Sequence, residues 1–197
     1  LGSPSAFIAN ADHTELAADL DRWVIGKVCA HAGKQLDEAA EQVGYSINLS
    51  AQSIRDPVLP AFCIEQCDRH GVAPARLCFE LGEAAVLGEP RALEFMQRMR
   101  AAGFAIALDD CGSTGSRLAE LGALPVDYLK IGGTLIQALA HDPVDGVLVD
   151  AINRVAHLSG KRTVAKWVED DIALDRVREL RLDYAQGFAI AEPQRIA

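Results

Sequence analysis

Four residues with oxygen-bearing side chains stand where short apolar segments end. Asn48, Glu80 and Asp109 each lie near the end of such a segment, and Asp110 follows Asp109 directly. One amide oxygen and three carboxylates form a ligand set suited to Mg²⁺ or Mn²⁺. Two metal ions suit phosphodiester hydrolysis, because one ion activates water and the other stabilises the leaving oxygen. A purely structural role, capping the following turn, is equally expected of Asp110.

The apolar segments alternate with segments of helical spacing. This alternation predicts repeated βα units and a parallel sheet. Helical spacing joins Leu16, Leu20, Trp23, Val24 and Val28, then Val147, Leu148, Ala151, Ile152, Val155 and Leu158, and then Leu174, Val177 and Leu180. The predicted strands are Tyr45–Leu49, Arg76–Leu81, Phe104–Asp109, Tyr128–Ile131, Thr163–Trp167 and Tyr184–Phe188.

Two architectures fit this alternation, an open doubly wound sheet and a closed barrel. The open sheet calls for a glycine-rich turn after its first strand, and the nearest candidate, Gly112-Ser113-Thr114-Gly115, follows the third strand without the required spacing. A barrel places functional side chains at the carboxyl ends of its strands. Lys130 ends the fourth predicted strand and Gln186 falls in the sixth, in addition to the four oxygen ligands. Polar residues on strand after strand favour the barrel.

Composition narrows the class of protein. The 197 residues are 50% hydrophobic and 24% charged, which is typical of a single globular domain. The net charge of −9, with no basic cluster, argues against binding to a nucleic-acid duplex. No long apolar run predicts membrane insertion, and the five cysteines fit no zinc pattern, so we expect reduced thiols and a cytoplasmic location. The abrupt start at Leu1 leads us to expect an N-terminally truncated domain over residues 1–197.

The motifs also carry a family resemblance. Seven segments, in order along essentially the whole chain, resemble the EAL family of cyclic-di-GMP phosphodiesterases. The two that resemble the opening part of the family are Ser3–Ile8 and Leu20–Val24. The five that resemble its later motifs are Ile47–Ser50, Phe79–Glu83, Leu108–Gly112, Leu124–Ile131 and Asp183–Phe188.

This resemblance implies an α/β fold, the TIM-like (β/α)₈ barrel of the EAL type, with cyclic-di-GMP across the carboxyl ends of the strands. It implies that Lys130 assists water activation, that Glu83 anchors the loop after the acidic pair, and that Gln186 contacts the nucleotide. The metal ligands that it implies are Asn48, Glu80, Asp109 and, for a second ion, Asp110.

The chain departs from the family in four places. The signature Glu-Ala-Leu strand, the first of the barrel, is missing from this sequence. The family's Lys-Ile-Asp ends here in Gly132, and the loop Cys111–Thr114 lacks the family's aromatic residue and second glycine. The family's Ala-Glu-Gly-Val-Glu has Lys166 in place of its first glutamate. We expect this lysine either to pair with Asp109 or Asp110 and supply the charge of the metal, or to point to solvent.

Loss of two carboxylates predicts the loss of efficient hydrolysis, but nucleotide binding is a separate property. Trp167 replaces a glycine, and it either stacks on a guanine, which is worth ~1–3 kcal/mol, or fills the emptied metal pocket. Glu169 and Asp21 are expected to accept hydrogen bonds from the two guanine edges.

Three functions follow from these expectations. The first is a catalytically inactive cyclic-di-GMP receptor module, with Trp167 and Gln186 in its favour. The second is a protein-interaction scaffold that binds no nucleotide. The third is a weakly active phosphodiesterase, which the remaining ligands keep open. No cofactor is expected, and Mg²⁺ or Mn²⁺ only where the site survives. The other expected partners are further domains of a longer signalling protein, and the resemblance allows a homodimer.

Overall fold

The computed structural model describes residues 16–35, 44–113, 118–139 and 142–194. The predicted opening motif Ser3–Ile8 and the loop residue Thr114 lie outside these ranges. The chain divides into two compact units, with the boundary between Ile106 and Ala107.

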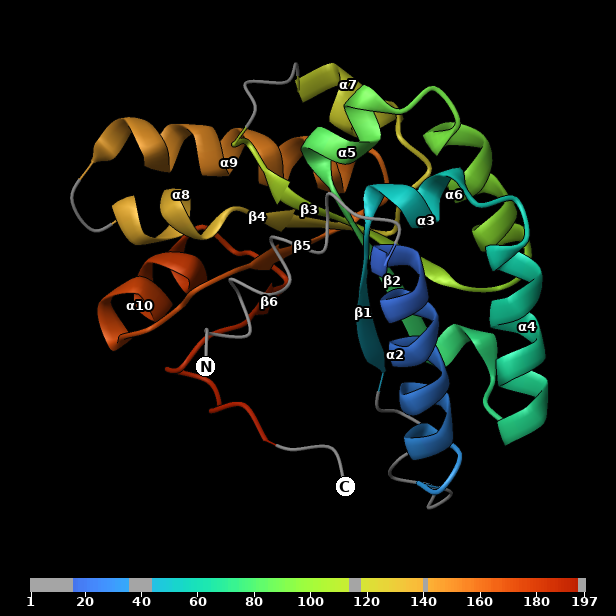
Figure 1. The fold of residues 1–197 in the computed structure, drawn as a ribbon. Helices are drawn as coiled ribbons and strands as arrows, with labels where there is room; N and C mark the ends of the chain where they lie inside the picture. The colour runs from blue at the N-terminus through green and yellow to red at the C-terminus, as the bar shows by residue number, and fades with distance from the viewer. Residues whose placement is uncertain (1–15, 36–43, 114–117, 140–141, 195–197) are drawn as a thin grey trace. The chain divides into compact units, whose positions relative to one another are not determined.

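The first unit pairs two parallel strands and covers them with helices (Figure 1). In the register of β1 and β2, Asn48 lies directly opposite Glu80. Helix α2 packs against α4 and β1, while α3 and α4 contact α6. The elements are α2 (Leu16–Ala32), β1 (Tyr45–Leu49), α3 (Ala51–Arg55), α4 (Leu59–His70), η2 (Pro74–Arg76), β2 (Leu77–Gly82), α5 (Glu83–Gly88) and α6 (Ala92–Ala101).

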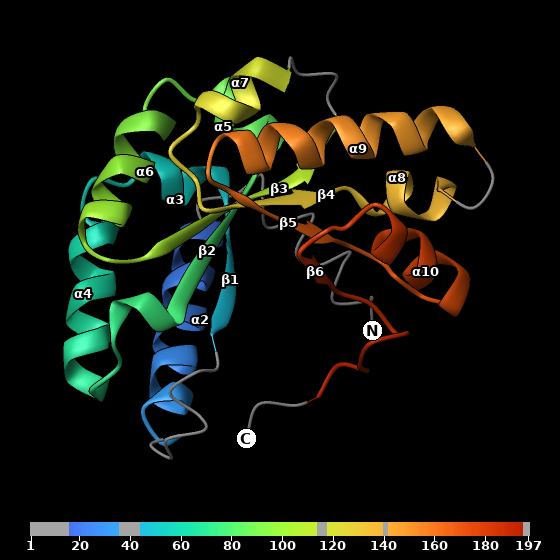
Figure 2. The same ribbon diagram turned by 180° about the vertical axis from the view of Figure 1, so that it is seen from behind.

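The second unit holds parallel strands in chain order, from β3 to β6. Helix α9 lies along β4 and β5 and contacts α7 and α8, as the view from behind also shows (Figure 2). The elements are β3 (Ala105–Cys111, which begins just before the boundary), α7 (Leu118–Ala123), β4 (Tyr128–Ile131), α8 (Gly133–Ala138), α9 (Pro143–Leu158), β5 (Arg162–Ala165), α10 (Asp171–Glu179) and β6 (Tyr184–Ala185).

All six predicted strands are present, and parallel pairing within each unit agrees with the βα alternation. The first and fourth match their predicted bounds, whereas β6 is shorter than predicted and leaves Gln186 just beyond its end. The strand prediction succeeded because an apolar segment bounded by turn residues specifies a buried parallel strand almost by itself.

The predicted buried faces of two helices are partly wrong. On α2, Trp23 is 61% exposed, while Ile25 and Cys29 on the neighbouring face are fully buried. On α9, Val147 and Leu158 of the predicted stripe are 70% and 88% exposed, whereas Ile152 of that stripe is fully buried together with Val149 and Ala156. Both buried faces include small residues, Ala17, Cys29 and Ala32 on α2 and Ala156 on α9, which a count of large side chains overlooks.

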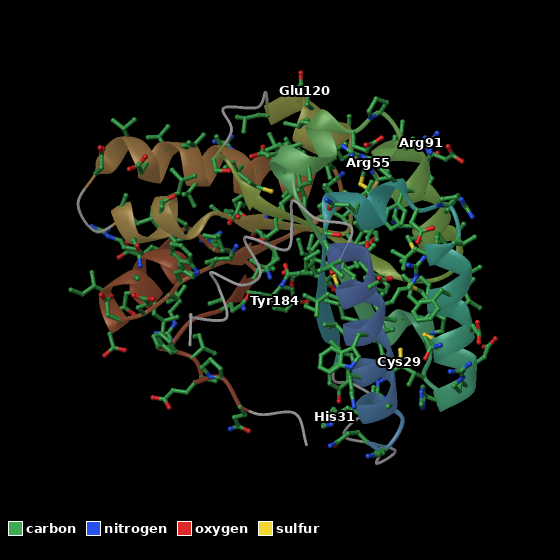
Figure 3. All side chains as sticks on the ribbon, in the orientation of Figure 1. Cys29, His31, Arg55, Arg91, Glu120 and Tyr184 are labelled. Carbon is green, nitrogen blue, oxygen red and sulfur yellow. The ribbon has the colours of Figure 1, made fainter. Side chains whose placement is uncertain are left out.

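Two further expectations concern thiols and membranes. All five cysteines are free, as expected. Cys29, Cys63 and Cys67 are buried where α2 meets α4, and Figure 3 labels Cys29 on α2. Among the described residues, no helix combines the length and apolar character that crossing a bilayer requires.

Candidate functional site

The acidic pair lies at the carboxyl end of β3, where the strand departs from regular pairing. The register with β4 shifts between Leu108 and Cys111. Asp110 has a φ of 57°, in the left-handed region that residues other than glycine rarely adopt. In a regular strand, successive side chains point to opposite faces. The irregularity re-aims Asp110, so that both neighbouring carboxylates reach one cation.

That cation is the ammonium group of Lys166, which follows the last residue of β5. Its Nζ lies 2.9 Å from both carboxylate oxygens of Asp109 and 2.6 Å from Oδ1 of Asp110. The hydrogen-bond geometry is satisfied toward Oδ2 of Asp109, and Oδ1 of that residue is buried without a hydrogen-bond partner. The Lys166 side chain is only 14% exposed. The expected pairing of Lys166 with the acidic pair is therefore present, and the lysine does not point to solvent.

The surroundings keep this lysine charged. Burial alone disfavours an ammonium, but the hydrogen bonds to Asp110 and Asp109 outweigh it and hold the pKa of Lys166 above its ordinary value. A hydrogen-bonded ion pair of this kind is strongest where water is partly excluded. The group therefore acts as a permanent cation at the end of β3.

A second lysine leaves the same sheet on the same face. Lys130 on β4 is opposite Val164 on β5, and Lys166 lies two residues beyond Val164. Because side chains alternate along a strand, Lys130 and Lys166 share a face. Lys130 is buried, at 5% exposure. The second unit thus sets two ammonium groups on one face of its sheet.

The first unit holds the other two predicted oxygen ligands. Asn48 and Glu80 are cross-strand partners, so their side chains leave β1 and β2 on one face. Asn48 is exposed, whereas Glu80 is buried at 4% exposure. Glu83 is buried at 1% exposure and begins α5 directly after β2. Their roles as metal ligands and loop anchor stay predictions.

Asp21 has a structural role that the sequence analysis missed. Its Oδ2 atom accepts hydrogen bonds from the backbone N–H of Ser50 at 2.8 Å, from the Ser50 hydroxyl at 2.7 Å and from the Ser53 hydroxyl at 2.7 Å. The side chain is buried, at 9% exposure. The predicted contact of Asp21 with a guanine stays a prediction. The signal that could have revealed the structural role is the pair of serines that follows Asn48, because buried hydroxyls require partners.

Trp167 is displayed at the surface by an unusual backbone. Its φ is 55°, in the left-handed region, and its side chain is 49% exposed. One part of the indole lies directly against Gly133, the first residue of α8. A Cβ added to that glycine would lie 2.1 Å from Cδ2 of the indole. The ring therefore rests on the start of α8 and leaves its other parts accessible, and its stacking on a guanine stays a prediction.

The remaining two predicted nucleotide contacts, Gln186 and Glu169, lie close to Trp167. Gln186 bonds to Val168, the next residue after Trp167, and Glu169 follows Val168. Gln186 is fixed through its backbone, which donates to Ala165 at 2.8 Å and accepts from the N–H of Val168 at 3.0 Å. Its side chain is exposed. Glu169 is also exposed and accepts a hydrogen bond from Gln137 of α8 at 3.3 Å. Both side chains are therefore available to a ligand, and both roles stay predictions.

A partly exposed polar network lies near the amino ends of β5 and β6 and was also missed by the sequence analysis. Oδ2 of Asp183 accepts from the N–H of Thr163 at 2.8 Å and lies 2.9 Å from Nε2 of His157. The Thr163 hydroxyl in turn donates to Asn153 of α9 at 2.7 Å. Burial raises the pKa of Asp183, but the hydrogen bonds from Thr163 and His157 outweigh this effect and lower it overall. The network fixes β5 against α9 and the segment before β6.

A cavity of about 240 Å³ lies in the first unit, between the end of α3 and the start of α6. Figure 3 labels two of its arginines, Arg55 and Arg91. Arg55 is paired with Glu89, and Asp56 is paired with Arg22. These ion pairs neutralise much of the charge around the cavity. It is lined by Ile54, Arg55, Asp56, Pro57, Arg91, Glu94, Phe95 and Arg98.

Comparison with known proteins decides the family. The model of the EAL domain family matches residues 1–193. This chain belongs to the EAL domain family. The cyclic di-GMP phosphodiesterase PdeB of Shewanella oneidensis is 33% identical over 196 residues, which are 99% of this chain and 23% of that protein. The bifunctional diguanylate cyclase/cyclic di-GMP phosphodiesterase MucR of Pseudomonas aeruginosa is 29% identical, over 97% of this chain and 28% of that protein.

Solved structures agree. The PaMucR phosphodiesterase in complex with c-di-GMP superposes with a TM-score of 0.91 at 28% identity, covering 98% of this chain and 78% of that one. The fold class is therefore the TIM-like fold of EAL domains. The chain spans about a quarter of the length of these two curated relatives.

EAL membership raises the question of whether a divalent metal fits the acidic pair. Mg²⁺ binds oxygen ligands at about 2.0–2.1 Å, so it would need the space between the carboxylates of Asp109 and Asp110. The Lys166 ammonium already occupies that space, within 2.9 Å of each carboxylate. Among the described residues, no group of three or more histidine, cysteine or acidic side chains is arranged to hold a metal. A divalent ion does not fit this site of the second unit while Lys166 is in place.

Proposed function

We propose that this chain is a cyclic-di-GMP-binding EAL module that does not hydrolyse the nucleotide efficiently. Binding is supported by relatives whose names give cyclic-di-GMP as their substrate, and by the structure of one of them with that ligand. The observation that carries the second half is the position of the Lys166 ammonium, 2.6 Å from Asp110 and 2.9 Å from Asp109.

The loss of turnover follows from the chemistry of phosphodiester hydrolysis. A metal-activated water needs divalent ions bound by carboxylates. In this chain Lys166 and Gly132 stand at two positions where the family pattern has carboxylates. Lys130 remains, but an assisting lysine has no metal-bound water to act on. Removing ligands of a two-metal site lowers the rate by orders of magnitude.

Binding draws on groups that need no metal. The accessible part of Trp167 offers a stacking surface for a guanine. The Lys166 ammonium, which uses two of its hydrogens for Asp109 and Asp110, offers its third N–H to a phosphodiester oxygen. The exposed side chains of Gln186 and Glu169 supply hydrogen-bonding groups beside them. This set supports a receptor role more directly than the scaffold alternative, for which a buried Trp167 would have been the supporting observation.

The test is a calorimetric titration of the chain with cyclic-di-GMP, once in EDTA and once in Mg²⁺, followed by chromatography of the products. The proposal expects the same affinity in both buffers and no linear dinucleotide. Linear dinucleotide formed with many turnovers in Mg²⁺ would establish an active phosphodiesterase instead. Absence of binding in both buffers would overturn the receptor role and support the scaffold alternative.

Three broader features belong to the same proposal. We infer a place within a longer signalling protein, since the chain spans about a quarter of the curated relatives cited above. A cytoplasmic location and a homodimer fit this role. Size-exclusion chromatography with light scattering, with and without cyclic-di-GMP, tests the dimer.

A further inference from the structure

The Lys166 ion pair has a consequence that concerns metal binding itself. We infer that Lys166 is a built-in cation that closes a divalent-cation site at Asp109 and Asp110, and that replacing this one side chain opens the site. The metal-binding part of this inference stands without any nucleotide. Only its extension, that the ammonium takes over the contact of a metal ion with a phosphodiester, rests on the proposed function.

The geometry of the carboxylates supports a cation position. They belong to adjacent residues, and both approach one point, the Lys166 Nζ, at 2.6 and 2.9 Å. Two of the three ammonium hydrogens are used in these bonds. Oδ1 of Asp109 is buried and has no hydrogen-bond partner, although it lies 2.9 Å from Nζ. An ammonium donates along fixed N–H directions and leaves this oxygen without a hydrogen bond. A metal ion has no such directions and could bind the same oxygen from the same place.

The electrostatic balance points the same way. Two carboxylates held this close repel each other, and a single charge of +1 offsets half of their combined charge. Without the ammonium, the pair would hold a charge of −2 at the end of β3. Mg²⁺ and Mn²⁺ commonly bind one or two carboxylates and complete their coordination with water. A site vacated by Lys166 therefore has the composition of a weak divalent-cation site.

The backbone on both sides is held in an uncommon conformation. Asp110 has a φ of 57° and Trp167, directly after Lys166, has a φ of 55°. Such conformations are unfavourable for a residue other than glycine and persist only where neighbouring contacts enforce them. The backbone carbonyl oxygen of Asp110 accepts hydrogen bonds from the N–H and the hydroxyl of Ser113, at 3.2 and 2.7 Å. The backbone of Asp110 is thus fixed by its own turn as well as by the ion pair, so the residue from which the carboxylate projects should keep its position when the lysine is changed.

The experiment measures Mn²⁺ binding by electron paramagnetic resonance, on the chain without nucleotide. Lys166→Met keeps the aliphatic stem and removes only the charge, and Lys166→Glu adds a third carboxylate. Lys34→Ala removes a lysine charge from an exposed position and serves as the matched control. We expect the original chain and Lys34→Ala to bind no Mn²⁺ at this site. We expect Lys166→Met to bind it, and Lys166→Glu to bind it at least tenfold more tightly than Lys166→Met.

A second substitution locates the metal. Adding Asp110→Asn to Lys166→Met should abolish the new binding. Thermal unfolding gives a second readout that also applies if the substitution lowers stability. A bound ion should raise the melting temperature of Lys166→Met in Mn²⁺ relative to EDTA, and the melting temperature of the original chain should not change. Equal Mn²⁺ affinity in the original chain and Lys166→Met overturns the inference. So does the absence of both Mn²⁺ binding and Mn²⁺ stabilisation in the two Lys166 variants.

Failure of the proposed function gives a different result. If the original chain does not bind cyclic-di-GMP but the Lys166 variants gain Mn²⁺, the receptor role is wrong and the built-in cation stands. If the chain binds cyclic-di-GMP equally in EDTA and Mg²⁺, Lys166→Met should weaken binding in EDTA at least fivefold, and Mn²⁺ should restore it. Unchanged affinity of Lys166→Met for cyclic-di-GMP in EDTA would show that the ammonium does not contact the phosphodiester.

Discussion

One carboxylate oxygen of Asp21 accepts hydrogen bonds from both the backbone N–H and the hydroxyl of Ser50, at 2.8 and 2.7 Å. Ser50 is the N-cap of α3 and comes directly after β1. The contact therefore fixes α2 to the point where the chain turns from a strand into a helix. Asn48 lies two residues earlier, on β1.

Asp21→Ala should destabilise the fold. The substitution leaves the donors of Ser50 and Ser53 buried without a partner, and we expect a loss of about 2–3 kcal/mol in the free energy of unfolding. Urea denaturation followed by circular dichroism measures it. Asp19→Ala on the same helix is the control, since Asp19 is 77% exposed and its distant ion pair contributes little. Equal stability of the two variants would contradict a structural role of Asp21.

Trp167→Ala should weaken the binding of cyclic-di-GMP. Loss of one stacked base corresponds to about 1–3 kcal/mol, or about a 5- to 150-fold increase in Kd. Trp23→Ala is the matched control, because Trp23 is also exposed but lies on α2. Calorimetric titration compares the two. Unchanged affinity of the Trp167→Ala variant for cyclic-di-GMP would show that Trp167 does not take part in nucleotide recognition.

Gly133→Ala should displace the indole of Trp167. The new methyl group would lie 2.1–2.5 Å from three ring atoms, and overpacking of this kind costs about 1–3 kcal/mol. Gly146→Ala on α9 is the control, since its methyl group would meet its nearest neighbour at 3.9 Å and should stabilise the helix by about 0.5–1 kcal/mol. Denaturation, with Trp167 fluorescence in a Trp23→Phe background, measures both effects. Stabilisation by Gly133→Ala with unchanged fluorescence would refute the contact.

Asp183→Asn should remove a pH-dependent part of the stability. The pKa of Asp183 is lower in the folded chain than its ordinary value, because the hydrogen bonds from Thr163 and His157 outweigh the effect of burial. Its contribution is therefore complete above about pH 4 and is lost as the pH falls through the folded-state pKa. The difference in melting temperature between the original chain and Asp183→Asn should shrink from pH 6 to pH 3. Asp175→Asn, at an exposed position of α10, is the comparison and should show no such trend. A difference in melting temperature between the original chain and Asp183→Asn that stays constant from pH 6 to pH 3 would show that the charge of Asp183 does not contribute to stability.

The residue pattern was sufficient for the strands, whereas it left the pairing of Lys166 as one of two alternatives. Parallel strands such as β4 are buried on both faces, so a continuous apolar segment marks them without knowledge of their neighbours. The pairing of Lys166 with Asp109 and Asp110, 57 and 56 residues away, was suggested only by the family resemblance, which places a metal-site carboxylate at its position.

Other features depend on partners that are distant in the chain. The buried face of α2 is set by its packing on α4 and β1, and small side chains there give no strong signal in the sequence. The serines that bind Asp21 are 29 and 32 residues away from it. Asp183 was part of a recognised motif, but its bonds to Thr163 and His157 depend on how β5 lies beside β6.

The contact between Lys166 and Asp109 is an intramolecular equilibrium. A metal ion arrives from solution, so its occupancy follows mass action and carries a cost in translational entropy at each binding event. For a tethered ammonium, this entropy loss is part of folding and does not recur. Its local concentration does not change when the surrounding solution is diluted. The charge at the end of β3 is therefore governed by the folding of the β5 segment, and whatever loosens that segment exposes both carboxylates at once.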